Sequence, residues 1–415
     1  MNIDQIVNQA EPELIALRRH FHEYPELSQQ EFNTLDFIKQ KLESWGISCT
    51  QVPQGGIFGV LDSGKPGITV LMRADVDALP VEENKENLST ARCCISRNKG
   101  VMHACGHDGH MAMLLTEAHI LASHKEEWDG KIIFMFEQAE EMGKRGIVPL
   151  MNYLADNHIH VDTCFGTHVL WCLPAGKVAI LDGAAMAGAF FFKVKIHGQG
   201  GHGSRPDQAC SPIEAFISFA AEIRNYRMLH VDPAHNLTFS LGMVQAGDTP
   251  NVIPSELTFA GTARVLDNED GLKFRKAFFE RLNDFCSLYG CSAEILTDQY
   301  YPVTVNYTPC VTLARRAISS AFGDSCMDNA ILPWMASETF SATESLYPGV
   351  FFFTGIQNLE KGCGASHHTD RFDIDEKGLT AGVKCALAYI LALLREKPDF
   401  KGFTPGDRKS ILQLM

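Results

Sequence analysis

One stretch of the chain, HACGHDGH (103–110), gathers several side chains that do chemistry in proteins. It holds three histidines, one cysteine and one aspartate within eight positions. Three kinds of site compete for this pattern. It could be a polar turn before a helix, a cysteine nucleophile with a histidine base, or a metal site that distant residues complete.

The metal site is the alternative that the residue types favour. A nucleophilic Cys105 with His107 as its base is disfavoured, because such partners usually come from distant segments. A polar turn accounts for one histidine more readily than for three. Thiolate, imidazole and carboxylate together suit zinc and its first-row neighbours. Cys105 and His107 are therefore the candidate ligands here, and the nucleophile alternative predicts inhibition by alkylation and resistance to chelators.

Other polar side chains follow apolar, strand-like runs elsewhere in the chain. Asp75 ends GITVLMRAD, Glu140 and Glu141 follow KIIFMFEQA, and His168 follows VDTCFGT. Ligands of open α/β sheets bind beyond the carboxyl ends of the strands, so we expect these side chains to meet at one sheet edge. Two adjacent carboxylates are costly unless a cation shares the site. One glutamate can then bind a metal while the other serves as a general base.

The surrounding pattern predicts the elements that position these residues. Apolar runs alternate with helical stretches such as 110–124 and 378–394, which predicts an α/β sheet with helices on both faces. Two helices are expected within 4–45, separated by Pro25-Glu26. Ser28 and Glu31 have the spacing of a capping box that would begin the second helix.

The pattern changes near residue 187. Alternating strands and two amphipathic helices then follow in the order strand, helix, strands, helix, which predicts an inserted α+β domain over 187–298. The α/β pattern resumes afterwards. We therefore expect one α/β domain built from 1–186 and 299–395, with 396–415 as a C-terminal tail.

Composition narrows the class of protein. The chain has 415 residues, 45% of them hydrophobic, a formal net charge of −14 and no block of basic residues. We therefore expect neither a nucleic-acid partner nor a membrane surface. No stretch approaches 18 uninterrupted apolar residues, and no signal peptide is evident. The 13 cysteines are scattered, which is typical of a reduced, cytoplasmic protein.

Taken in order, these segments resemble the di-metal amidohydrolase branch of the aminoacylase and carboxypeptidase metallopeptidase superfamily. That branch includes hippurate hydrolases, indole-acetyl-amino-acid hydrolases and N-acyl-amino-acid amidohydrolases. The matching segments are RRHFHEYPELSQQE, RADVDALPVEE, GVMHACGHDGHMAMLL, AEE, GTHVLWCLPAGKVA, GGHGSRP, NVIP, GTAR and HHTDRFDIDE. The resemblance implies a di-zinc-peptidase-like catalytic domain with a mixed sheet, and an inserted α+β domain that acts as a lid and in dimerisation.

The resemblance also implies a set of metal ligands. Two divalent ions are expected, zinc or manganese, with cobalt and nickel as further candidates. The five implied ligands are Cys105, His107, Glu141, His168 and His368. Glu140 is implied as the general acid and base that activates a metal-bridging water, and Asp75 as a carboxylate that orients a ligand. His368 is preferred to His367 because the family's histidine stands four residues before an aromatic residue, here Phe372.

Residues of the inserted domain are implied to bind the substrate. His202 in GQGGHGSRP would donate to the substrate carbonyl or carboxylate, from its own subunit or from a partner. Asn251 and Arg264 would bind the substrate's carboxylate. The implied reaction is hydrolysis of N-acyl-amino acids by a homodimer. The alternatives are a dipeptidase or carboxypeptidase of the same superfamily, and a non-catalytic metal-binding relative.

Two segments depart from the family pattern. The family commonly has Gln-Pro before Ala-Glu-Glu, whereas this chain has Glu137-Gln138. The additional acid is expected either to perturb Glu140 or to face solvent. The segment 84–99 is unusually polar, and we expect it to shape the mouth of the pocket.

Overall fold

The computed structural model describes residues 1–415 and divides into two compact units. The first comprises 1–185, 305–332 and 342–408, and the second comprises 186–304, 333–341 and 409–415. The main segment of the second unit is thus an insertion in the first, over 186–304 where the sequence predicts 187–298.

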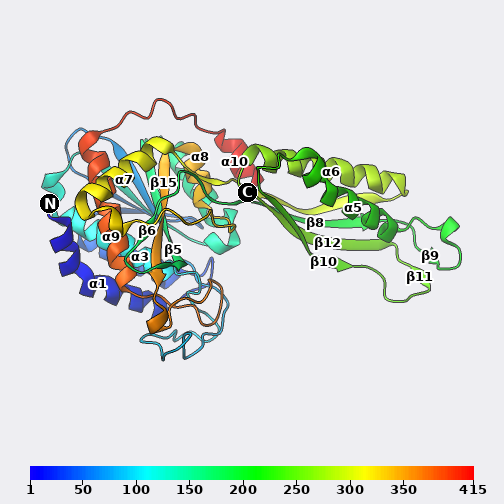
Figure 1. Cartoon of the computed structure of the whole chain (residues 1–415), viewed down its shortest axis with the longest axis horizontal. Helices are drawn as coiled ribbons and strands as arrows, with labels where there is room; N and C mark the ends of the chain where they lie inside the picture. Colours follow the sequence, from blue (N-terminus) through cyan, green and yellow to red (C-terminus); the bar gives the residue numbers. More distant parts are fainter. The chain divides into compact units, whose positions relative to one another are not determined.

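A mixed seven-stranded sheet forms the centre of the first unit, as predicted (Figure 1). Its strand order is β1-β2-β4-β3-β5-β15-β6. The three pairings at its middle, β3 with β4, β3 with β5 and β5 with β15, are parallel, and the outer pairings are antiparallel. The strands are β1 (Ser48–Val52), β2 (Gly56–Asp62), β3 (Thr69–Asp75), β4 (Lys131–Glu137), β5 (Thr163–Pro174), β6 (Val178–Ala179) and β15 (Gly349–Gln357).

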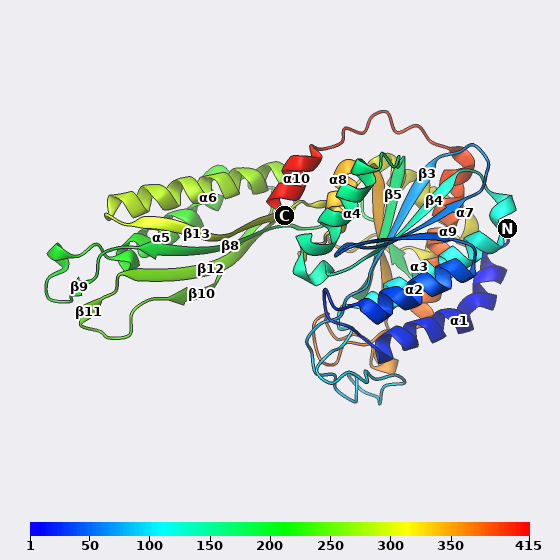
Figure 2. The same ribbon diagram turned by 180° about the vertical axis from the view of Figure 1, so that it is seen from behind.

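Helices cover both faces of this sheet. On β2, Phe58 stacks on Tyr153 of α4 with ring centroids 5.7 Å apart. Its neighbour Gly59 faces Leu42 of α2, because adjacent strand residues point to opposite faces. Figure 2 shows α1, α2 and α3 together beside the sheet. The helices are α1 (Ile3–Glu23), α2 (Phe32–Ser44), α3 (His107–Ser123), α4 (Lys144–Asp156), α7 (Thr308–Phe322) and α9 (Lys377–Glu396).

The helix α9 is the one helix long and apolar enough to cross a membrane by length and composition. Within its most apolar window, however, 78% of the helix is buried. It packs against α1, α3, α7 and β15. A core helix passes the same test, and burial of this extent is what such a helix shows.

The second predicted helix does not begin with a capping box. It starts at Phe32 with Glu31 as its N-cap, and no side chain caps it. The hydroxyl of Ser28 instead donates to Asp77, and the carboxylate of Glu31 binds the segment after β4. Both side chains are therefore drawn away from the helix end by partners distant in sequence.

The second unit contains a four-stranded antiparallel sheet in the order β10-β12-β8-β13, with α5 and α6 packed together on it (Figure 1). Phenylalanines fill the space between the helices and the sheet; Phe192 and Phe278, for example, lie 4.5 Å apart. The elements are β8 (Gly188–His197), β9 (Gly201–His202), α5 (Pro212–His230), β10 (Leu237–Gln245), β11 (Val252–Ile253), β12 (Glu256–Val265), α6 (Asn268–Leu288) and β13 (Ser292–Tyr301).

Short elements complete the chain. Those near the boundaries of the units are β7 (Gly183–Met186), β14 (Thr304–Asn306), α8 (Phe340–Leu346) and α10 (Arg408–Leu414). The 3₁₀ turns are η1 (Lys125–Glu127), η2 (Glu140–Met142), η3 (Pro206–Gln208), η4 (Asp324–Cys326) and η5 (Leu359–Lys361).

Candidate metal centre

The register of the central strands brings the predicted polar residues to one edge of the sheet. Asp75 ends β3 and pairs with Glu137 at the end of β4. His168 lies inside β5 rather than after it, because β5 continues to Pro174. Since Arg73 pairs with Gly166, His168 is nevertheless level with Asp75. Parallel strands thus deliver these side chains to the same end of the sheet.

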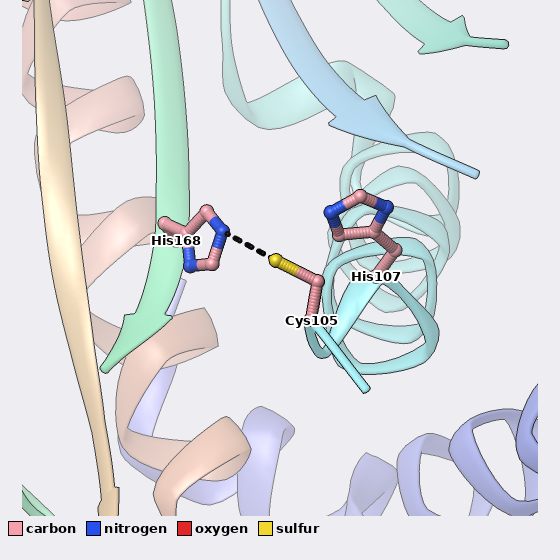
Figure 3. Close-up of side chains that lie close together, drawn as sticks. All are labelled: Cys105, His107 and His168. Carbon is pink, nitrogen blue, oxygen red and sulfur yellow. Dashed lines mark hydrogen bonds between the residues drawn. The ribbon is translucent and has the colours of Figure 1, made fainter. Parts of the chain in front are cut away.

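Cys105 approaches this edge from the loop before α3 (Figure 3). Its Sγ lies 3.5 Å from Nε2 of His168 and 3.3 Å from Nε2 of His368. The next residue, Gly106, has φ +91°, and a Cβ there would lie 2.4 Å from the side chain of Val169. Glycine at this position therefore allows the cysteine loop to pack closely on β5.

His107 is the first residue of α3 and is completely buried. Its Nδ1 lies 2.9 Å from the backbone carbonyl of Asp77 and 3.2 Å from that residue's carboxylate. This contact orients the ring and leaves Nε2 to face Glu141, whose Oε1 is 3.9 Å away. Sequence reasoning did not single out Asp77. The signal was present, since Asp75 and Asp77 are two residues apart.

The histidine closest to the carboxylate of Asp75 is His110, not His107. Its carboxylate lies 2.6 Å from Nδ1 of His110 and accepts a hydrogen bond from Arg73 at 2.8 Å. Nε2 of His107 is farther away, at 3.6 Å. Despite burial, His107, Arg73 and His110 hold the pKa of Asp75 well below its usual range. Asp75 is thus ionised, with a guanidinium and two imidazole rings around it.

The two C-terminal histidines have different surroundings. Nε2 of His368 lies 3.2 Å from Oε1 of Glu141, and the residue has φ +63°. The ring of His367 packs 4.7 Å from that of Phe372 and 5.1 Å from that of His168. His368 therefore joins Cys105 and Glu141, whereas His367 packs beside them.

The donor atoms fit divalent metal ions. Two groups have ligand atoms within 4.8 Å of one another and share Cys105: Cys105 with His107 and His168, and Cys105 with Glu141 and His368. Glu140 lies within the same distance of His107 and Glu141. Nε2 of His107 and Oε1 of Glu141 are buried and make no hydrogen bond. Thiolate, imidazole and carboxylate at these separations suit zinc-like ions.

The electrostatics of the unligated groups agree with that fit. Burial, with Glu141 next, raises the pKa of the Cys105 thiol well above its ordinary value. Burial, with His110 and His367, lowers the pKa of His168 well below its ordinary value, so this ring is neutral. A neutral imidazole can bind a cation directly. The thiol needs a nearby cation to become a thiolate.

The additional acid of this chain is buried and pairs with an arginine. Glu137 is fully buried, and its carboxylate lies 2.7 Å from the guanidinium of Arg73. The expectation that it faces solvent was therefore wrong, whereas an effect on Glu140 stays a prediction. An arginine on the neighbouring strand neutralises it, and that pairing depends on strand register.

The polar segment 84–99 is tied to the loop that carries His368. The guanidinium of Arg92 donates to the backbone carbonyls of Asn84, Asp370 and Phe372, at 2.7, 2.9 and 2.7 Å. This arginine thus fixes the path of the loop around His368, a contact that sequence reasoning missed.

The predicted substrate-binding residues lie in the second unit. His202 and Asn251 are held together, since β9 pairs with β11 and Gly203 donates to the carbonyl of Asn251 at 2.8 Å. Arg264 lies on β12 with its guanidinium 4.7 Å from the ring of Phe191. The strand from Glu256, near β11, to Arg264 spans about 26 Å at the usual rise per residue. His202, on the separate two-stranded β9–β11 sheet, therefore lies beyond the end of β12 that is opposite to Arg264.

Comparison with known proteins places this geometry among metallopeptidases. Residues 71–392 match the family model described as peptidase family M20/M25/M40. Thermostable carboxypeptidase 1 of Saccharolobus solfataricus is 35% identical over 94% of this chain and 96% of its own. N-acyl-L-amino acid amidohydrolase of Geobacillus stearothermophilus is 35% identical over 74% of this chain and 81% of its own.

A solved structure agrees with the fold. The crystal structure of a dinuclear metal binding peptidase of the M20 family from Bacillus subtilis is 28% identical to this chain. It superposes with a TM-score of 0.77 and covers 94% of this chain and 99% of its own. The two proteins therefore share an architecture along nearly their whole lengths.

Proposed function

Because this chain belongs to peptidase family M20/M25/M40, a hydrolytic family that acts on amide or peptide bonds, we propose that it hydrolyses N-acyl-amino acids. The products would be a carboxylic acid and a free amino acid. At the coarser level the protein is a metal-dependent amidohydrolase. The amidohydrolase relative, whose name states N-acyl-L-amino acids, supports the substrate class.

The observation that carries the proposal is the pair of ligand groups that share Cys105, with Glu140 beside them. Cys105, His107, Glu141, His168 and His368 would hold two divalent ions, zinc or manganese. When bound, the ions would supply Lewis acidity and a water of lowered pKa.

The chain's own groups would move the proton. Glu140 accepts a proton from the attacking water and returns it to the leaving nitrogen. Neither a free hydroxide nor a nitrogen anion then builds up. Asp77 keeps the ring of His107 in one orientation, and Asp75 holds His110. Arg264 and Asn251 bind the carboxylate of the amino acid, and His202 donates to the carbonyl oxygen that becomes negative.

We infer a homodimer from the positions of these residues. One small substrate cannot reach both His202 and Arg264 of a single chain, because Arg264 lies near one end of β12 and the β9–β11 pair that carries His202 lies beyond the other end. If both bind it, one of them comes from a second copy. The lid and dimerisation roles of the inserted unit, and a cytoplasmic location, remain predictions.

A carboxypeptidase or dipeptidase activity is the second candidate. The relative named thermostable carboxypeptidase 1 matches this chain over 94% of its length, more than the amidohydrolase does. A substrate with a free α-amine would distinguish this activity from the first, whose substrates have a blocked amine.

The test is a substrate panel assayed with chelated and metal-reconstituted enzyme. We expect N-acetyl and N-benzoyl amino acids to be hydrolysed, chelation to abolish turnover, and zinc or manganese to restore it. A preference for unblocked dipeptides would favour the second candidate. Full activity after chelation, with inhibition by a thiol alkylator, would replace both with a cysteine nucleophile.

A further inference from the structure

The segment between α1 and α2, Pro25–Glu31, lies against the chain at the sheet edge where the candidate ligands meet. We name it the PELSQQE segment after its sequence. Leu27 forms a parallel bridge with Ala78, whose N–H donates to the carbonyl of Glu26 at 2.8 Å. The segment lies outside residues 71–392, which match the family model. Its backbone is nevertheless attached to the chain directly after Asp77.

Glu31 binds the turn that precedes the two glutamates. Its side chain is fully buried. One carboxylate oxygen accepts the N–H of Ala139 at 2.8 Å, and the other accepts the side-chain amide of Gln138 at 2.8 Å. Ala139 has φ +54° and ψ +41°, the left-handed conformation that residues with a Cβ rarely adopt. The carboxylate thus holds a strained residue directly before Glu140.

Ser28, three residues before Glu31, contacts Asp77, the carboxylate beside His107. Its hydroxyl donates to Oδ2 of Asp77 at 2.7 Å. The same oxygen accepts the backbone N–H of Glu141 at 3.1 Å, and Oδ1 faces Nδ1 of His107 at 3.2 Å. The serine therefore fixes a carboxylate that itself contacts two candidate ligands.

The environment of Glu31 argues against a role in stability alone. Burial, with Asp77 next, raises the pKa of Glu31 to about 7. Its hydrogen-bond partners, an amide side chain and a backbone N–H, carry no charge. A buried carboxyl group without a cationic partner is costly to the fold. What it supports is the conformation of Ala139.

We propose that Glu31 and Ser28 are positioning residues for the metal centre. Glu31 imposes the turn that directs Glu140, and Ser28 fixes Asp77 and, through it, His107 and Glu141. The proposal deepens the proposed function and rests on it, since its kinetic readout needs the amidase activity. A second readout, metal affinity, does not.

The first test compares E31A with E31Q in the metal-loaded enzyme. E31A removes the acceptor for the Ala139 N–H, and we expect kcat to fall roughly 10- to 100-fold with little change in KM. E31Q keeps one acceptor, and its amide can donate to a flipped Gln138, so its kcat should stay near wild type. Wild-type kcat in a folded E31A would overturn the role of Glu31.

A third variant tests whether the turn is the route of the effect. Glycine adopts positive φ without the Cβ penalty. Adding A139G to E31A should therefore recover part of the lost kcat. No recovery would show that Glu31 does not act through the turn and would overturn this step.

The second test measures metal affinity of S28A by competition with a chelator. S28A removes the hydrogen bond to Asp77, the carboxylate that orients His107, and should weaken zinc affinity roughly 10-fold. Unchanged affinity would overturn the role of Ser28, and if E31A does not fold, this measurement decides the proposal. If the wild type binds zinc but hydrolyses no substrate of the panel, the proposed function fails while this test still stands.

E26A is the matched control on the same segment. The side chain of Glu26 accepts hydrogen bonds from the backbone N–H of Thr34 at 2.8 Å and from the amide of Asn33 at 2.6 Å. It contacts the start of α2 and none of the candidate ligands. E26A should lower the thermal unfolding temperature while leaving kcat and zinc affinity unchanged. A loss of kcat in E26A equal to that in E31A would assign the effect to general destabilisation.

Discussion

Cys105 lies where the two candidate ligand groups meet, and this position explains why a cysteine suits it. One sulfur atom is 3.5 Å from a histidine of β5 and 3.3 Å from the histidine of the C-terminal loop. A thiolate has lone pairs for two cations, and its pKa falls when a cation is close. Buried as it is, the thiol would otherwise stay protonated. A nucleophilic role would need an ionised sulfur without a metal.

The adjacent glutamates provide a prediction at this scale. Glu140→Gln should retain both metal ions, because the five candidate ligands are intact, but lower kcat by about 10²- to 10⁴-fold. Glu141→Gln, the same exchange one residue later, should lose metal. Metal content and kcat measured on both variants check this. Full activity of the Glu140 variant, or full metal content of the Glu141 variant, would contradict the assigned roles.

Among the elements, α3 connects the metal centre to the core. Its first residue is His107, and fourteen of its residues are buried. It packs against α1, α9 and β3. A helix buried on all sides has little freedom to shift, so the position of His107 is set by the packing of the whole helix. One buried residue of α3, Glu117, has a measurable effect on the free energy of unfolding.

Glu117 on α3 yields a prediction about stability and pH. Burial raises the pKa of this carboxyl well above its ordinary value. A raised pKa means that the folded protein favours the protonated form. The contribution of Glu117 to the free energy of unfolding is therefore fully present below the pKa that this group has in the unfolded chain. It is lost as the pH rises through the pKa that it has in the folded protein. The free energy of unfolding of wild type should fall, relative to E117Q, by about 1.4 kcal/mol per pH unit across that window.

Urea unfolding of wild type and E117Q at pH 5 and pH 8 measures this difference. The metal centre titrates in both proteins, so it cancels in the comparison. Glu43→Gln, an exchange of an exposed glutamate on α2, is the control and should show no such pH dependence. A constant difference between wild type and E117Q across pH would show that Glu117 is not protonated in the folded protein.

At the scale of the whole molecule, the residues of the proposed site are divided between two units. The first unit contains the candidate ligands and Glu140, and the second contains His202, Asn251 and Arg264, which we propose bind the substrate. Within the second unit, β12 separates Arg264 from the end that carries His202. A complete site that uses both residues must therefore draw on two copies of the chain.

Complementation tests this arrangement. H202A and E140Q chains should each be nearly inactive alone. Co-expressed as a mixed dimer, they should regain activity, because the chain with intact Glu140 receives His202 of the partner subunit. Purification with two different tags isolates the mixed species. Absence of recovery in a confirmed mixed dimer would show that His202 acts within its own chain or not at all.

The family, an α/β sheet with helices on both faces and a meeting of polar side chains at its edge could be predicted from the sequence. Apolar runs that break into charge mark the ends of buried strands, and parallel strands end at a common edge. Asp75, Glu140, Glu141 and His168 could be placed together on that ground. These inferences depend on residue type and local order, which are properties of the sequence.

The contacts that hold these side chains in place could not be predicted from the sequence. Ser28 and Glu31 have the spacing of a helix cap, yet they bind Asp77 and the Gln138-Ala139 turn. Glu137, expected near solvent or Glu140, pairs with an arginine of the adjacent strand. A hydrogen-bond partner depends on which distant segments pack side by side. The spacing of residues along the chain does not predict that packing.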